Sequence, residues 1–111
     1  MPTNTGFKYD GARWTCRVDL DAENGLTSEQ RLPQAGDATI AISPPAAGTV
    51  LVEFSVSSTA DLEAGNALFI PAEGLADGGA VAQPTIDSIP STVTAIRVTA
   101  SAAGGRVEVA Q

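Results

Sequence analysis

The feature that most constrains this chain is the alternation of apolar and polar residues in short runs. In the run RWTCRVDL every second residue is apolar, and the residues between them are polar or charged. A period of two is typical of a strand that buries one face in an antiparallel sheet. The run therefore predicts a strand over residues 13–20, with a buried side formed by Trp14, Cys16, Val18 and Leu20.

Further runs of the same kind predict the rest of the fold. Turns rich in Gly, Pro, Asp and Ser separate them, and no stretch sustains a helical period. Residues 58–66 admit either one helical turn, capped by Ser58 or Thr59 and ended by Gly65, or a plain loop. The remaining predicted strands cover residues 38–43, 49–57, 67–71, 80–86, 93–100 and 106–110.

This pattern predicts an all-β fold. We expect a single-domain antiparallel β-sandwich, jelly-roll or immunoglobulin-like, with about seven or eight short strands. A small barrel is the alternative. The β domain is expected to span residues 12–111, and residues 1–11 form an N-terminal arm without a core-forming pattern.

Length and composition agree with one folded domain. A chain of 111 residues is long enough to bury one core, and 43% hydrophobic residues exclude a disordered protein. The apolar runs are too short to span a membrane. The N-terminus lacks the basic and apolar segments of a signal peptide, so we expect synthesis in the cytoplasm. Cys16 is the single cysteine and is expected to be a buried free thiol.

Charge is unevenly distributed along the chain. The net charge is −7, and four of the six cations lie in the first 31 residues, after which no Lys or Arg occurs until Arg97. An acidic field repels phosphates, because nucleic-acid binding depends on cations that displace counterions. Nucleic acid is therefore not an expected partner.

The residue types argue against catalysis. Histidine is absent, so the commonest general base and the usual zinc sites and nucleophile-His arrangements are missing. The stretch DLDAENG resembles the start of a calcium loop, but Gly25 falls one position late for that geometry. A solvated acidic turn is the simpler interpretation. We expect no enzyme activity, no cofactor and no bound metal.

The arm and the first strand are the predicted partner-binding site. Arg13 and Arg17 lie on the same side of the strand, about 13 Å apart. They either keep an exposed sheet face soluble or dock it on an acidic surface. The arm either packs on its own domain or reaches a neighbouring subunit. The predicted partner-binding residues are Phe7, Lys8, Tyr9, Arg13 and Arg17.

Three motifs in residues 48–111 carry a family resemblance. GTVLVEFSVS, then ALFIPAEG, then STVTAIRVTASAAGGRVEVAQ resemble, in that order, the strands of very small β-sandwich structural proteins of tailed bacteriophages. Those proteins often have a Trp after the central strand, where this chain has Leu68 and Phe69. The first third of the chain carries no part of the resemblance.

The resemblance implies a non-enzymatic component of a virion. It favours a capsid decoration or cement protein that is made in the host cytoplasm, binds the outer surface of the major capsid protein, stabilises the head and forms a homo-oligomer, with a trimer favoured. One alternative is a tail, neck or baseplate component of the same particle. Another is a receptor- or carbohydrate-binding head, which would need a groove lined by Phe69, Glu73 and Asp77.

Overall fold

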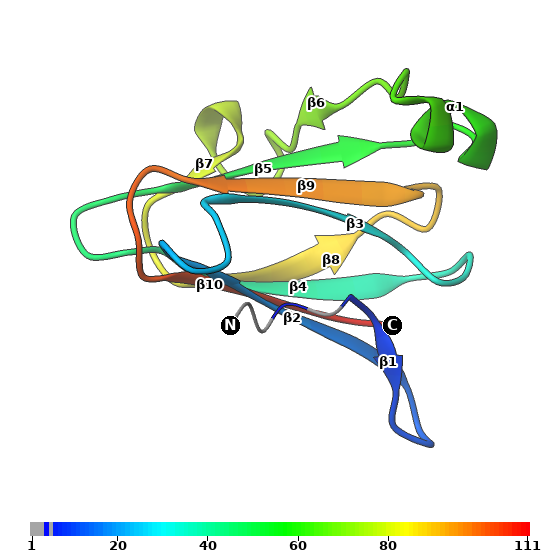
Figure 1. Cartoon of the computed structure of the whole chain (residues 1–111), viewed down its shortest axis with the longest axis horizontal. Coiled ribbons are helices and arrows are strands. Elements are labelled where there is room, and N and C mark those ends of the chain that lie inside the picture. The colour runs from blue at the N-terminus through cyan, green and yellow to red at the C-terminus, as the bar shows by residue number, and fades with distance from the viewer. Residues whose placement is uncertain (1–3, 5) are drawn as a thin grey trace.

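A computed structural model of the chain describes residues 4 and 6–111, which form two antiparallel sheets packed face to face (Figure 1). Sheet I contains, in spatial order, β1 (Lys8–Tyr9), β2 (Trp14–Leu20), β10 (Gly105–Ala110), β4 (Ala38–Ser43) and β8 (Thr85–Ile89). Sheet II contains β3 (Thr27–Arg31), β9 (Ala95–Ala100), β5 (Val50–Ser55) and β6 (Ile70–Pro71), and β7 (Ala80–Val81) pairs with β5 beside β6. The predicted all-β sandwich is confirmed.

The core lies between the two sheets and is built from the apolar side of each alternating run. Sheet I contributes inward residues from β2, β4, β8 and β10, and sheet II contributes inward residues from β5, β7 and β9. Burial of such aliphatic side chains is the dominant stabilising term in a domain of this size. The fully enclosed members are Val18, Leu20, Ile40, Val50, Val52, Ile89, Ile96, Val98 and Val107, each with no exposed surface.

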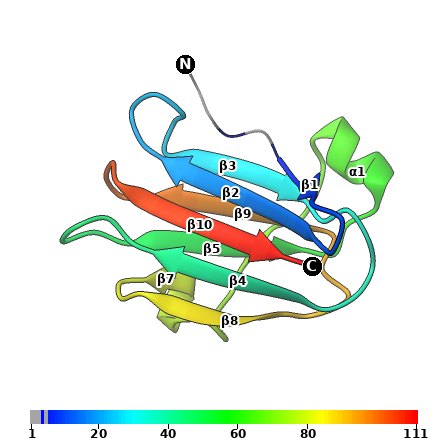
Figure 2. The same cartoon turned by 90° about the horizontal axis from the view of Figure 1, so that it is seen from below.

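The chain changes sheet at most of its connections. After the β1–β2 hairpin, each link except those joining β5, β6 and β7 crosses from one sheet to the other. As a result β2 and β10, from opposite ends of the chain, lie side by side, as Figure 2 shows. Residues far apart in the sequence therefore share the outward side of sheet I.

Three strand predictions need correction. No strand was predicted at β3, whose sequence TSEQR has no apolar residue, yet it pairs with β9 along five residues. The single strand predicted over 80–86 is wrong, because the chain leaves sheet II after β7 and enters sheet I at β8. Pro84, which cannot donate a ladder hydrogen bond, lies in that crossing. The strand predicted over 67–71 is confined to β6.

The short segment after β5 forms a helix rather than a plain loop. Helix α1 (Thr59–Ala64) begins after Ser58, whose hydroxyl accepts a hydrogen bond from the Asp61 amide, and ends at Gly65 in the left-handed conformation. Leu62 is buried and fastens the helix to the domain. A 3-10 turn, η1 (Asp77–Gly79), precedes β7.

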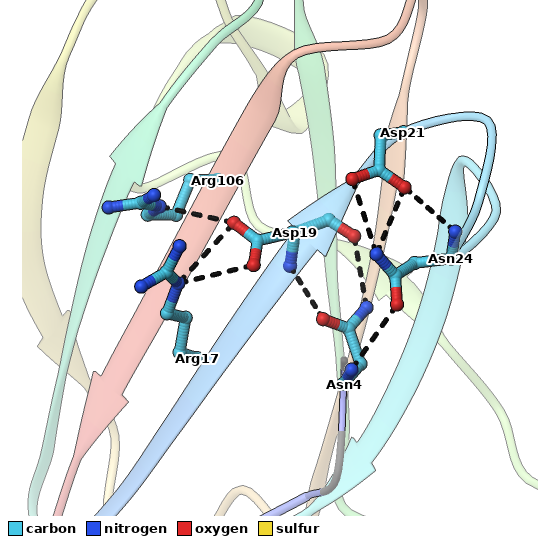
Figure 3. A network of polar contacts seen from close by, with 6 residues as sticks. All are labelled: Asn4, Arg17, Asp19, Asp21, Asn24 and Arg106. Carbon is cyan, nitrogen blue, oxygen red and sulfur yellow. Dashed lines mark hydrogen bonds and ion pairs between the residues drawn. The ribbon is translucent and has the colours of Figure 1, made fainter. Parts of the chain in front are cut away.

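The described part of the N-terminal segment packs on the chain's own sandwich. Lys8 and Tyr9 pair with the start of β2, and Phe7 is half-buried against the core. The Asn4 side chain makes two hydrogen bonds to the main chain of Asp19 in β2, from its Nδ2 (2.9 Å) and to its Oδ1 (2.8 Å). The Asn4 amide also donates to Asn24, in the loop that leads to β3 (Figure 3). The segment thus ties β2 to the loop that joins the two sheets, while contact of the arm with a neighbouring subunit remains a prediction.

Candidate partner-binding face

The outward side of sheet I gathers four of the six cations of the chain. Arg17 and Arg106 project from β2 and β10, Arg13 precedes β2, and Lys8 shares the side of its β-partner Thr15. The strand positions of the same side carry two carboxylates, Asp19 and Glu108. We call this surface the cationic face; its polar and small residues also include Thr15, Thr39, Ala41, Ser43 and Ala110.

One carboxylate of the cationic face, that of Asp19, forms ion pairs with two of its arginines. The Asp19 carboxylate lies 3.2 Å from Nε of Arg17 and 3.2 Å from Nε of Arg106, and its side chain is 22% exposed (Figure 3). Because Asn4 holds the Asp19 main chain, the carboxylate has a defined position. Asp19 therefore orients both guanidinium groups, which remain about half exposed and retain free donors.

Two shallow hollows lie next to one another on the cationic face. One has a volume of about 370 Å³ and lies over β2, β10 and β4, between Arg13 and Arg17. The other has a volume of about 300 Å³ and lies over β10, β4 and β8, beside Arg106 and Pro84. Ala41, Ile86 and Glu108 line both and mark the boundary between them. Small residues in β4 and β10 leave this surface open enough to receive side chains of a partner.

Three of the five predicted partner-binding residues belong to this face. Among residues 4 and 6–111, Lys8 and Arg13 form no ion pair, and the charge of Arg13 acts only on the nearby Asp10 carboxylate, whose pKa it helps to lower. Tyr9 and Phe7 lie elsewhere: the Tyr9 ring packs against Trp14, with centroids 5.4 Å apart, and Phe7 packs on the core. The structure thus separates the predicted cations from the predicted aromatics.

A tight turn positions Arg13. The carboxylate of Asp10 accepts hydrogen bonds from the main-chain amides of Arg13 and Ala12, each 3.0 Å long. These two hydrogen bonds hold the pKa of Asp10 below its ordinary value of 3.8. The turn links β1 to β2 and places Arg13 at the edge of the cationic face.

The outward side of sheet II holds a different charged cluster. Arg97 forms a two-pronged ion pair with Glu53, with Nε–Oε1 at 3.0 Å and Nη2–Oε2 at 3.2 Å, and its guanidinium lies 4.3 Å from the Phe69 ring centroid. The hydrogen bond with Glu53 raises the pKa of Arg97. Glu53 and Arg97 are register partners in the β5–β9 pair, so this ion pair joins the two strands. One face of Phe69 is thereby covered, which disfavours the sugar-stacking role considered for that ring.

Other sequence-based candidates occupy structural positions. Cys16 is 3% exposed, and burial raises its pKa to about 11, far from a reactive thiolate at neutral pH. Asp21 caps its own turn by accepting hydrogen bonds from the amide and side chain of Asn24. Across the described part of the chain, no three acidic, Cys or His side chains converge as metal ligands would, and no described helix is long and apolar enough to cross a membrane.

Comparison with protein families, curated proteins and solved structures finds no match. Sequence reasoning found Arg13 and Arg17, which belong to one alternating run. The role of Asn4 was not predicted. The grouping of Arg106 with Arg17 was not predicted either, because it follows from the β2–β10 register, which no local sequence pattern encodes.

Proposed function

We propose that this protein is a non-enzymatic structural component of a bacteriophage virion. In this role it decorates the head, docking its cationic face on an acidic part of the outer surface of the major capsid protein and stabilising the capsid. The observation that carries the proposal is the concentration of cations on one shallow sheet face of a chain whose net charge is −7. The family resemblance of residues 48–111 supports the choice of a virion.

The geometry of the face suits a protein surface better than a small molecule. The hollow beside Arg13 and Arg17 is open to solvent, and its lining mixes arginine with Thr15, Ala41 and Ala110. A flat face of this type buries area against a complementary surface, and complementary charge sets orientation and speeds encounter. The unpaired Lys8 and Arg13 are the side chains that would form new ion pairs, whereas Arg17 already has Asp19.

A tail, neck or baseplate protein would use the same physical contact, so the copy number decides between them. A head decoration protein is present in hundreds of copies per particle, and a tail component in far fewer. Quantitative mass spectrometry of purified particles of the virus that encodes the chain measures this ratio. Near-stoichiometric amounts relative to the major capsid protein support the proposal, and absence from the particle or a few copies contradicts the head assignment.

Charge reversal tests the surface. The double variant Lys8→Glu/Arg13→Glu should lose attachment to particles stripped of the protein, measured by co-sedimentation. Arg31→Glu is the control, because Arg31 is exposed on β3 in the other sheet. Among the described residues its ion-pair partner is Glu63, at 3.6 Å on the surface. Equal loss in the control and the double variant would show that overall charge, and not this face, governs attachment.

A further inference from the structure

Strand β8 (Thr85–Ile89) is the outermost strand of sheet I, and Figure 2 shows it at the margin of the sheet. It pairs with β4 along its whole length, and no strand in the described part of the chain pairs with its other side. Ile86, Asp87 and Ser88 are all exposed. An exposed strand edge is a template to which another strand can add, so natural proteins protect such edges.

The ladder pattern shows which main-chain groups of β8 point to its open side. Trp14 and Gln111 exchange both main-chain hydrogen bonds, and the bonds of an antiparallel ladder alternate from one residue to the next. Followed through the registers of β10 and β4, this alternation directs every second residue of β8 to β4. The residues directed to β4 are Thr85, Asp87 and Ile89. The N–H and C=O groups of Ile86 and Ser88 therefore point to the open side.

Asp87 lies at the centre of this edge. Its register partner in β4 is Ile40, which has no exposed surface, so Asp87 lies on the inward side of sheet I although it is itself exposed at the margin. The Oδ1 atom of Asp87 accepts a hydrogen bond of 2.7 Å from the Ser88 amide. Because that amide points to the open side, the strand caps one of its own edge donors with a charged side chain.

The outward groups of Ile86 and Ser88 allow three two-fold registers between β8 of one copy and β8 of another. Opposing Ile86 to Ile86 sets Ser88 against Pro84, and opposing Ser88 to Ser88 sets Ile86 against Pro90. Both of these registers lose a ladder bond, because proline has no N–H to donate. The register that avoids proline opposes Ile86 to Ser88 and therefore sets Asp87 against Asp87.

We propose that Asp87 prevents copies of this chain from joining through the β8 edge. In the register that avoids proline, the two Asp87 residues form a non-hydrogen-bonded pair, whose Cα atoms lie about 4.5 Å apart and whose side chains are close together. Like charges directly opposite one another destabilise an antiparallel pair. Pairing would also separate the Ser88 amide from the Asp87 carboxylate that binds it in the single chain.

The block keeps two copies of sheet I from merging into one continuous sheet. Any oligomer of this chain is then held by contacts other than β8–β8 pairing. The inference concerns the main-chain edge of β8 and does not depend on the proposed capsid attachment, which uses the outward side of sheet I.

Sedimentation velocity over a concentration series of Asp87→Val tests the inference. The variant removes the charge and places a strand-forming side chain at the centre of the edge. It should self-associate at least about tenfold more tightly than the wild type and form species of twice the wild-type mass. Amide hydrogen exchange locates the contact, because the Ile86 amide should exchange more slowly in the associated variant than in the wild type.

Two further variants of β8 separate the charge from added hydrophobicity. Ser88→Val adds the same side chain but keeps Asp87, and Asp87→Lys loses the carboxylate cap but keeps like charges opposite one another, so both should associate no more than the wild type. Association of either variant to the extent of Asp87→Val overturns the inference. A folded Asp87→Val chain that keeps the wild-type mass up to about 1 mM also overturns it. If Asp87→Val loses the native Trp14 fluorescence, Asp87→Asn gives the same test, because it removes the charge with little change of shape.

Discussion

Asn4 joins the N-terminal segment to β2, the strand that carries Arg17 and Asp19 of the cationic face. Its side-chain amide makes hydrogen bonds of 2.9 and 2.8 Å to the carbonyl and the amide of Asp19, and its own main-chain amide donates to Asn24 over 3.2 Å. In Asn4→Ala the main-chain contact persists and the two side-chain bonds are lost. The substitution therefore isolates the connection between the arm and β2.

The expected loss follows from those two bonds. A hydrogen bond contributes about 0.5–1.5 kcal/mol net, which gives roughly 1–3 kcal/mol for the pair. Asn4 is partly buried at a sheet margin, where water replaces part of what the Asp19 main chain loses, so we expect about 1–2 kcal/mol. The loss is also bounded: once the arm has detached, further weakening of its contacts no longer affects the rest of the domain.

Urea unfolding followed by Trp14 fluorescence measures this difference. With an m-value of about 2 kcal/mol/M, the midpoint should fall by roughly 0.5–1 M while m itself is unchanged. Asn66→Ala is the control, since Asn66 is exposed after α1 and should give no shift. Hydrogen exchange at the Asp19 amide should accelerate in Asn4→Ala. If both asparagine variants unfold at the wild-type midpoint, the assigned role of Asn4 is wrong.

Three further predictions follow from local geometry. Gly79→Ala should lower the free energy of unfolding in urea by at least about 2–3 kcal/mol, because Gly79 has φ +75° and an added Cβ would lie 2.7 Å from the Val52 carbonyl oxygen. Gly78→Ala is the control: Gly78 has φ +65° but open space around it, so the substitution should cost about 1 kcal/mol. Cys16 should resist a thiol reagent at pH 8 in the native protein and react fully in denaturant, since its pKa is about 11; fast native labelling would contradict its burial. Because the pKa of Asp10 is lowered in the folded protein, its carboxylate stabilises the turn at pH values above 3.8, and this contribution is lost as the pH falls through the pKa of the folded state. In Asp10→Ala, NMR of the turn should no longer show that part of the acid dependence.

The strands that fill the core are predictable because each carries its own signal. β2, β4, β5, β9 and β10 alternate apolar and polar residues, and most of their inward residues are buried; Ser55 and Ala95 are buried as well, on the side of Glu53 and Arg97. β3 lies at the margin of sheet II, where its inward residues Ser28 and Gln30 are polar and half-buried, so no apolar pattern marks it. Pairing with β9 defines it, and that is a tertiary property.

The candidate face is predictable only within one strand. Arg13 and Arg17 share a side because their spacing is even, which the sequence states directly. Arg106 joins them because β10 pairs with β2 in a register that sets it opposite Asp19. Ile86 joins them because the chain changes sheet between β7 and β8, and alternation carries no information about which sheet a strand enters.

Most of the cations are grouped in space as well as along the sequence, because the strands that carry them are neighbours in sheet I. Lys8, Arg17 and Arg106 come together because β1, β2 and β10 are neighbours, while β6 and β7, which carry no cation, both pair with β5 in sheet II. Screening by salt weakens contacts between exposed charges far more than it weakens burial of aliphatic side chains. Attachment through Lys8 and Arg13 should therefore weaken as ionic strength is raised, and attachment that is unchanged at high salt would contradict a contact made by exposed charges.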